Sequence, residues 1–239
     1  MADLSRHARQ IVLPEIGVAG QTALRDSRVL LVGLGGLGCP AARYLAGAGI
    51  GTLMLADRDR VERSNLPRQT LYQEADVGRL KVDAAIEHLQ RVDASLHLQG
   101  LHTPEATLAA VRDADVVLDC TDNFEARFAL NAACVAARVP LVSGAAIRWE
   151  GQVAAFDLRR GGPCYACLYP NTGEAAEACE DAGILGPVVG VVGAMQALLA
   201  LQILLGQADV AGHLHLWDAR RGDWRKLKLV RDIHCPHCS

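Results

Sequence analysis

The sequence predicts an α/β protein with a doubly wound, mostly parallel sheet and a C-terminal lobe of antiparallel strands. Over the first two thirds of the chain, short apolar runs alternate with stretches of helical spacing, which is the pattern of a parallel sheet covered by helices. After about residue 150 the runs become hairpin-like and surround a loop rich in Gly, Pro and Cys. We therefore expect one domain over residues 1–239, with halves at 1–150 and 151–239.

The expected elements follow one another along the chain. Apolar runs that are bounded by turn residues and too short for helices predict strands at residues 28–32, 52–56, 95–99, 115–119 and 140–144. Helical spacing between these runs predicts helices at residues 39–49, 80–93 and 123–138. In the second half we expect a strand at 151–159, an apolar helix at 187–206 with Pro187 in its first turn, and a hairpin of strands at 214–219 and 223–230.

Composition excludes several classes of partner. The 24 basic and 27 acidic side chains give a net charge of -3, so no overall field draws the protein to nucleic acid or to an anionic membrane. Residues 187–206 are long enough to span a bilayer, but their glycine-rich first half and the absence of flanking Lys and Arg favour a buried or interface helix. The charged start of the chain lacks the apolar core of a signal sequence, which favours a reducing cytoplasm for the 8 cysteines.

A glycine-rich turn follows the first expected strand and predicts a Rossmann-like nucleotide site. Gly33, Gly35 and Gly38 satisfy the spacing GxGxxG. We expect Gly33 to allow the tight turn, Gly35 or Gly36 to let a phosphate approach the helix N-terminus, and Gly38 to allow close packing of helix on strand. Asp57, at the end of the second strand, is placed to accept hydrogen bonds from ribose hydroxyls. This set fits NAD, FAD and ATP alike.

Polar residues that follow in the chain favour a triphosphate. Asn65, Arg68 and Gln69 lie in one loop, and Lys81 opens the next expected helix. Cationic and amide donors beside a ribose-binding carboxylate are suited to neutralise charge beyond the α-phosphate. The loop therefore favours ATP over a dinucleotide.

Two aspartates mark the end of another expected strand. Asp119 and Asp122 fall at the edge where a doubly wound sheet binds its ligand. Asp122 is suited there to bind Mg2+ beside phosphates, to cap the following helix, or to do both.

Four of the cysteines form two CxxC pairs. Cys164 with Cys167 and Cys235 with Cys238 predict a tetrahedral zinc site that staples the C-terminal lobe. His237, inside the second pair, is a substitute ligand, although four thiolates already complete the coordination. The site would make the C-terminal half a zinc-binding half.

These motifs together resemble the MoeB/ThiF family of adenylyltransferases, relatives of the ubiquitin-activating enzymes. The resemblance rests on GLGGLG at 33–38, SNLPRQ at 64–69, Lys81, DCTDN at 119–123 and the two CxxC pairs, and it runs from about Arg6 to Cys238. It implies ATP-dependent adenylylation of the C-terminal glycine of a small ubiquitin-like sulfur-carrier protein that ends in Gly-Gly. Pyrophosphate is released, as a step toward the carrier thiocarboxylate of the molybdopterin or thiamine pathway.

The resemblance also implies roles for individual residues. The implied nucleotide site comprises Gly33, Gly35, Gly36, Gly38, Asp57, Asp59, Ser64, Asn65, Arg68, Gln69, Lys81, Asp122 and Asn123. The implied catalytic set is Arg9, Arg68, Lys81, Asp122 and Cys179. Arg9 would enter the site across a homodimer interface, Asp122 would bind Mg2+, and Cys179 would attack the adenylated carrier to form a thio-linked species.

Some positions leave alternatives open. Cys179 is either that nucleophile or a free thiol without a role, whereas Cys39, Cys120 and Cys134 fall in apolar elements and are expected in the core. Pro67 stands where relatives usually have Gln, and His7 replaces a usual aromatic near Arg9, so neither contact carries over.

Two other functional classes compete with the adenylyltransferase. An NAD- or FAD-dependent oxidoreductase would explain the glycine turn and Asp57 but would leave the SNLPRQ donors without a role. A non-catalytic zinc scaffold that binds a ubiquitin-like protein would explain the cysteine pairs alone. No fused rhodanese-like domain is expected, so a separate sulfurtransferase or cysteine desulfurase would supply sulfur. The type of carrier stays open.

Overall fold

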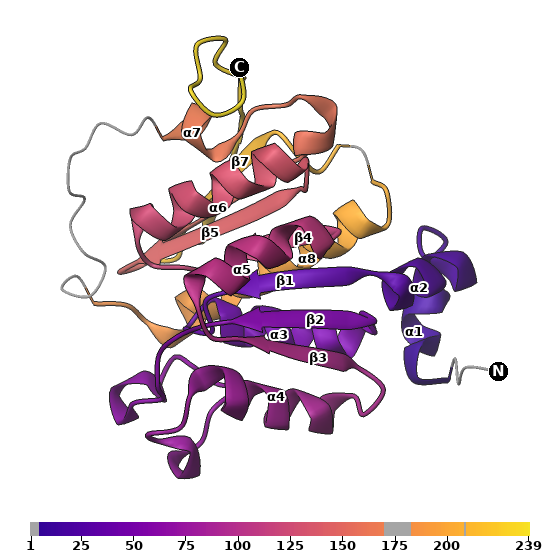
Figure 1. Ribbon diagram of the computed structural model, residues 1–239, viewed down its shortest axis with the longest axis vertical. Helices are drawn as coiled ribbons and strands as arrows, with labels where there is room; N and C mark the ends of the chain where they lie inside the picture. Colours follow the sequence, from indigo (N-terminus) through magenta and orange to yellow (C-terminus); the bar gives the residue numbers. More distant parts are fainter. Residues whose placement is uncertain (1–4, 170–182, 208) are drawn as a thin grey trace.

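All eight strands of the described chain lie in one mixed sheet (Figure 1). The computed structural model describes residues 5–169, 183–207 and 209–239. The order of strands across the sheet is β3-β2-β1-β4-β5-β6-β7-β8. Their bounds are β1 Arg28–Val32, β2 Thr52–Ala56, β3 His97–Leu101, β4 Val116–Asp119, β5 Leu141–Ile147, β6 Glu150–Phe156, β7 His213–Asp218 and β8 Asp223–Lys228. The first five strands pair in parallel, and the last three continue the sheet in antiparallel fashion.

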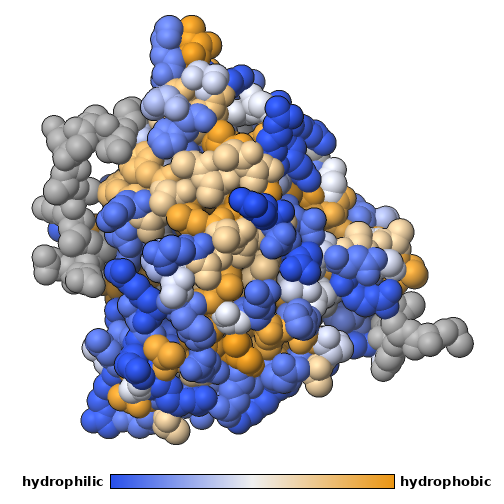
Figure 2. Space-filling model, in the orientation of Figure 1, coloured by the Kyte–Doolittle hydropathy of each residue, from blue (hydrophilic) through white to orange (hydrophobic). Residues whose placement is uncertain are grey.

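Helices cover both faces of this sheet. Their bounds are α1 Ala8–Ile11, α2 Gly17–Asp26, α3 Gly38–Ala48, α4 Lys81–Val92, α5 Pro104–Ala110, α6 Phe124–Ala137, α7 Tyr165–Leu168 and α8 Gly186–Leu204. Successive residues of a strand point to opposite faces. Leu31 belongs to an apolar cluster that includes residues of α3, α4 and α8, whereas Leu30 belongs to one that includes residues of α5, α6 and α7. Figure 2 shows the face covered by α5 and α6, where apolar side chains gather over α6.

The elements predicted in the first half are present, some with shifted bounds. β1 and β2 have the predicted bounds, whereas β3 begins two residues later than predicted. The delay arises because Asp93 Oδ1 accepts hydrogen bonds from the Ser95 backbone N–H at 2.9 Å and the Ser95 hydroxyl at 2.7 Å, which commits these residues to a turn. The helices α1, α2 and α5 lie outside the predicted elements.

The antiparallel strands predicted for the second half are present, and they extend the same sheet. β5 runs on to Ile147, opposite Glu150, and so forms a tight hairpin with β6. Arg148, in the hairpin turn, has a φ of 54°, in the left-handed region. Continuous strand pairing therefore joins residues 1–150 to residues 151–239.

The apolar helix α8 is a core element. It is long and apolar enough to cross a membrane by length and composition alone, yet 50% of that stretch is buried inside the protein. It packs on α3, β5 and β6. Val191 and Leu198 remain 38% and 48% exposed on its outer side. This placement agrees with the predicted buried or interface helix.

Candidate active site

The glycine turn between β1 and α3 leaves room for a ligand at one glycine. Gly33 has a φ of 92°, and a Cβ there would lie 2.6 Å from the Cys120 carbonyl oxygen. A Cβ at Gly38 would lie 1.8 Å from the Gly33 carbonyl oxygen, and one at Gly36 would lie 2.8 Å from a Val189 methyl group of α8. At Gly35 the nearest atom would be 3.8 Å away. Three glycines are thus required by packing, and Gly35 is the one open to an anion at the N-terminus of α3.

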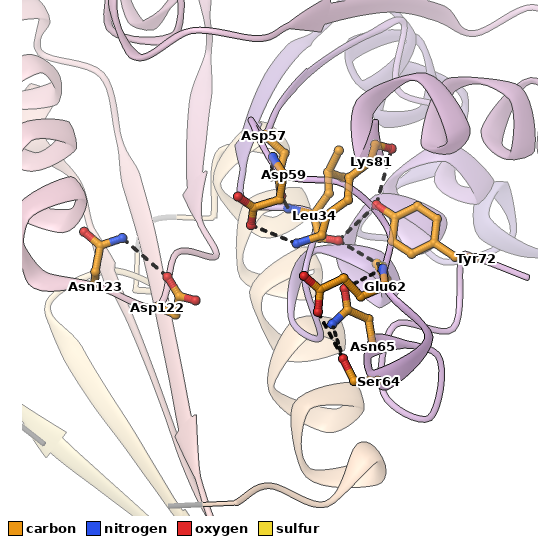
Figure 3. Close-up of polar contacts among 11 residues, drawn as sticks. Leu34, Asp57, Asp59, Glu62, Ser64, Asn65, Tyr72, Lys81, Asp122 and Asn123 are labelled. Atoms are coloured by element: carbon orange, nitrogen blue, oxygen red, sulfur yellow. Dashed lines mark hydrogen bonds and ion pairs between the residues drawn. The ribbon is translucent and has the colours of Figure 1, made fainter. Parts of the chain in front are cut away.

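Asp57 holds the glycine turn from the end of β2 (Figure 3). One carboxylate oxygen accepts a hydrogen bond from the Leu34 backbone N–H at 2.7 Å, and the other accepts one from the Asp59 N–H at 2.8 Å. Each carboxylate oxygen has a second lone pair, so the group can still accept hydrogen bonds from ribose hydroxyls. The predicted role of Asp57 is therefore compatible with its structural role.

Lys81 brings a buried positive charge to the same edge of the sheet. Its Nζ lies 3.0 Å from Asp59 Oδ2, and the Lys81 side chain is 8% exposed against 60% for Asp59. Because the carboxylate is the exposed partner, it can move away when a phosphate takes its place. Asp59 was predicted to contact the nucleotide; in the structure its carboxylate pairs with Lys81.

The loop that carries the predicted phosphate donors is held by its own side chains. Asn65 Oδ1 accepts a hydrogen bond from the Glu62 N–H at 3.2 Å, and the Ser64 hydroxyl donates to the Glu62 carboxylate at 3.2 Å. Arg68 Nη1 donates to the Ser64 carbonyl at 2.9 Å. Gln69 is 4% exposed, and its Oε1 has no hydrogen-bond partner among the described residues. The loop is thus held in shape by contacts among its own residues.

Tyr72 fastens this loop to the glycine turn and was missed by the sequence analysis. Its hydroxyl donates to the Leu34 carbonyl at 3.0 Å and lies 3.4 Å from the Lys81 carbonyl. Burial raises the pKa of Tyr72, so its hydroxyl stays protonated as a donor. The sequence does carry a signal for this role, because Tyr72 is an aromatic residue inside a mostly polar loop.

Asp122 faces this group from across the glycine turn (Figure 3). The prediction that Asp122 caps the following helix was wrong, because Asn123 Oδ1 accepts the capping hydrogen bond from the Ala126 N–H at 2.9 Å. Asp122 is exposed, and its carboxylate accepts a hydrogen bond from Asn123 Nδ2 at 3.3 Å. With the cap supplied by its neighbour, Asp122 is free to act as a metal ligand.

Arg9 lies at the opposite edge of the sheet. The neighbouring Gln10 donates to the Ala48 carbonyl at the C-terminal end of α3 at 3.1 Å, whereas the glycine turn precedes the N-terminal end of that helix. The 11 residues of α3 separate the two ends by about 16 Å. Arg9 therefore does not join the site of its own chain. Cys179, also in the predicted catalytic set, lies outside the described residues.

The four paired cysteines come together between α7 and the C-terminal segment. Cys164 Sγ lies 3.9 Å from Cys167 Sγ and 3.6 Å from Cys235 Sγ, and Cys167 Sγ lies 3.5 Å from Cys238 Sγ. Sulfur atoms bound tetrahedrally at about 2.3 Å from Zn2+ are about 3.8 Å apart. The geometry therefore fits one tetrahedral metal ion.

Neighbouring N–H groups point to two of these sulfur atoms. Asn131 Nδ2 lies 3.6 Å from Cys164 Sγ, and the Asp232 backbone N–H points to Cys167 Sγ at 3.5 Å. Such N–H donors orient metal-bound thiolates and spread their charge. The ring of His237 instead stacks on Phe128 with centroids 6.2 Å apart, so it is not part of the ligand set.

Three single cysteines are core residues, as predicted. Burial raises the pKa of Cys39 and of Cys134 to about 12, and it raises the pKa of Cys120 well above its ordinary value. These thiols stay protonated at neutral pH and are poor nucleophiles.

Comparison with known proteins settles the family. Residues 7–237 match the model of the ThiF family. The chain belongs to the ThiF family. It is 47% identical over 248 residues to the molybdopterin-synthase adenylyltransferase of Escherichia coli (strain K12), covering 100% of both chains. It is 46% identical over 240 residues to the sulfur carrier protein ThiS adenylyltransferase of the same organism, covering 99% of this chain and 96% of that protein.

Other relatives extend the comparison. The ThiF-family chain is 47% identical to the adenylyltransferase and sulfurtransferase MOCS3 of Anopheles gambiae, over 99% of its own length and 55% of that protein. Its fold also matches the crystal structure of Escherichia coli MccB, with a TM-score of 0.85 at 20% identity, covering 100% of this chain and 73% of that one. The MccB likeness concerns the fold alone.

Proposed function

We propose that this ThiF-family protein uses ATP to adenylylate the C-terminal glycine of a ubiquitin-like sulfur-carrier protein. The observation that carries the proposal is the constellation at one sheet edge: an open glycine turn, the buried cation Lys81 and the exposed carboxylate Asp122. Full-length likeness to two adenylyltransferases supports it. We further propose that the chain works as a single domain, with residues 1–150 binding nucleotide and 151–239 binding metal and carrier.

The reaction needs alignment and charge neutralisation. A carboxylate oxygen of the carrier's last glycine attacks the α-phosphorus of ATP. The bond between that phosphorus and the oxygen that bridges the α- and β-phosphates breaks, and pyrophosphate leaves with the electron pair of this bond. The nucleophile is already ionised at neutral pH, so no general base is required. Lys81 and Arg68 offset the charge of the triphosphate, and Gly35 admits a phosphate to the helix N-terminus. Asp122 would hold Mg2+, which supplies further neutralisation of the leaving pyrophosphate.

Carrier-dependent exchange of labelled pyrophosphate into ATP tests this function. We expect exchange with a carrier that ends in Gly-Gly and none after its last glycine is removed, because the attacking carboxylate is then displaced. The same assay, run with a molybdopterin-type and a thiamine-type carrier, identifies the substrate. Absence of exchange with both carriers, or preferential binding of NAD over ATP, would contradict the proposal.

We also propose that the active unit is a cytoplasmic homodimer. Arg9 lies far from the site of its own chain, so it can contribute only to the site of a second copy. The outer side of α8, with Val191 and Leu198, offers an apolar surface for that copy.

Arg9 and Cys179 stay in the proposed catalytic set, with Cys179 as the residue that forms a thio-linked carrier. We further propose that a separate sulfurtransferase or cysteine desulfurase supplies sulfur to the adenylylated carrier.

The four-cysteine cluster is proposed to bind structural zinc. Zinc would join α7 to the C-terminal segment, which otherwise lacks regular structure in the described chain. We expect about one zinc per chain by elemental analysis. Cys164→Ala should lose the metal and lower the thermal unfolding midpoint, because a structural metal stabilises the fold directly.

Cys134→Ala is the matched control for the zinc proposal. Both cysteines are 0% exposed, so each substitution removes a buried thiol. Cys134→Ala is expected to lower stability while keeping the metal content. A wild-type protein purified without zinc and unaffected by added zinc would refute the zinc site.

A further inference from the structure

A buried carboxylate ends β4 shortly before Asp122. Asp119 is 0% exposed. Its Oδ2 accepts a hydrogen bond from the Ser143 hydroxyl of β5 at 2.7 Å. Its Oδ1 accepts two from Thr121, one from the hydroxyl at 2.6 Å and one from the backbone N–H at 3.1 Å. A buried carboxylate needs such donors, so Thr121 is held strongly in this position.

The backbone around Thr121 is fixed by further contacts from three elements. Arg127 Nη2 of α6 donates to the Thr121 carbonyl at 2.6 Å. Gln196 Nε2, from the middle of α8, donates to the Asp119 carbonyl at 2.8 Å. The Cys120 N–H donates to the Val32 carbonyl at 2.8 Å, which ties the segment to the last residue of β1.

The same segment lies against the glycine turn. A Cβ on Gly33 would lie 2.6 Å from the Cys120 carbonyl oxygen and 3.1 Å from the Thr121 nitrogen. After Asp122, Asn123 caps α6. The residues on both sides of Asp122 are therefore anchored, whereas within the described part of the chain its own carboxylate accepts a side-chain hydrogen bond from Asn123 alone. The anchors fix where that carboxylate stands relative to the phosphate-binding turn.

We infer that Asp119 and Thr121 are positioning residues, which hold the loop so that the Asp122 carboxylate binds the divalent cation of the nucleotide complex. The inference rests on the proposed function, since it assigns Asp122 to that cation. The Thr121 hydroxyl acts by donating to Asp119, without touching nucleotide or metal. Loss of this bond removes one anchor of the segment between Asp119 and Asn123, so the Asp122 carboxylate is held less closely in place.

Thr121→Val tests the inference, because it removes the hydroxyl and keeps the shape of the side chain. We expect Mn2+ binding, followed by electron paramagnetic resonance with a non-hydrolysable ATP analogue, to weaken by about tenfold or more, as when an outer partner of a metal ligand is removed. In the exchange assay kcat should fall by a similar factor while KM for ATP changes by less than about threefold, because only the cation is misplaced. Thr121→Ser keeps the donor and should restore both values.

Thr107→Val is the control for loss of a threonine hydroxyl in general. Thr107 is 7% exposed in α5, and its hydroxyl donates to the Thr103 carbonyl at 2.8 Å, away from the site. It should leave Mn2+ binding unchanged. If Thr121→Val does not fold, Ser143→Ala removes the other hydroxyl donor of Asp119 and should weaken Mn2+ binding in the same direction.

The outcomes separate this inference from the proposed function. Unchanged Mn2+ affinity in Thr121→Val, or equal losses in Thr121→Val and Thr121→Ser, would overturn the positioning role. The binding measurement needs no carrier, so it decides this point even if the wild-type protein shows no exchange. Lack of exchange in the wild type would count against the proposed function alone.

Discussion

Asp122→Ala is expected to lower carrier-dependent pyrophosphate exchange by about 10²–10³-fold, equivalent to about 3–4 kcal/mol of transition-state stabilisation. The expected loss is large because the carboxylate is assigned to hold the divalent cation at the leaving pyrophosphate. The fold should be unaffected, because Asp122 is exposed and the cap of α6 belongs to Asn123. The measurements are the exchange rate at saturating ATP and carrier, and the thermal unfolding midpoint.

Glu125→Ala provides the matched control for Asp122→Ala. Glu125 is also an exposed carboxylate and lies in the first turn of α6, so its removal changes the local charge by the same amount. It should keep the exchange rate within about threefold of wild type, because long-range effects of exposed charges are screened. If Asp122→Ala retains more than about a tenth of the wild-type rate, the proposal that Asp122 binds the cation is wrong.

The main features of the fold could be predicted because local patterns determine them. Apolar runs bounded by turn residues located the first strands, and helical spacing located α3, α4 and α6. The rule that ligands bind at the carboxyl ends of parallel strands placed Gly35, Asp57 and Asp122 at one edge. The early helices α1 and α2 were missed, since Val12 and Leu13 on the segment between them remain 76% and 50% exposed and give no clear buried stripe.

The pairing of site residues could not be predicted, because it depends on contacts between distant parts of the chain. The GxGxxG pattern does not say which glycine packs on α8, since Val189 is far away in sequence. The same holds for Gln196, a polar residue in an apolar helix that proves to hold the end of β4. Asp59 and Lys81, which form an ion pair, are likewise 22 residues apart in the sequence. Sequence spacing identified the chemical groups, and tertiary packing assigned their partners.

Arg9→Ala is expected to lower exchange about as strongly as Asp122→Ala does, roughly 10²-fold or more, because a cation at a polyanionic transition state is removed. Each homodimer would lack this cation in both of its sites. Arg25→Ala is the control, since Arg25 is an exposed arginine on the nearby α2, with a side chain 53% exposed. It should retain the wild-type exchange rate.

Mixed dimers decide whether Arg9 acts on its own chain or on the partner. When the Arg9→Ala and Asp122→Ala chains assemble at random, about half of the dimers are mixed, and each mixed dimer holds one site with Arg9 from one chain and Asp122 from the other. Exchange should therefore recover to about a quarter of the wild-type rate. An arginine that acts within its own chain would give no recovery, because both chains would then be inactive. A wild-type protein that sediments as a monomer while it catalyses exchange would also contradict the shared site.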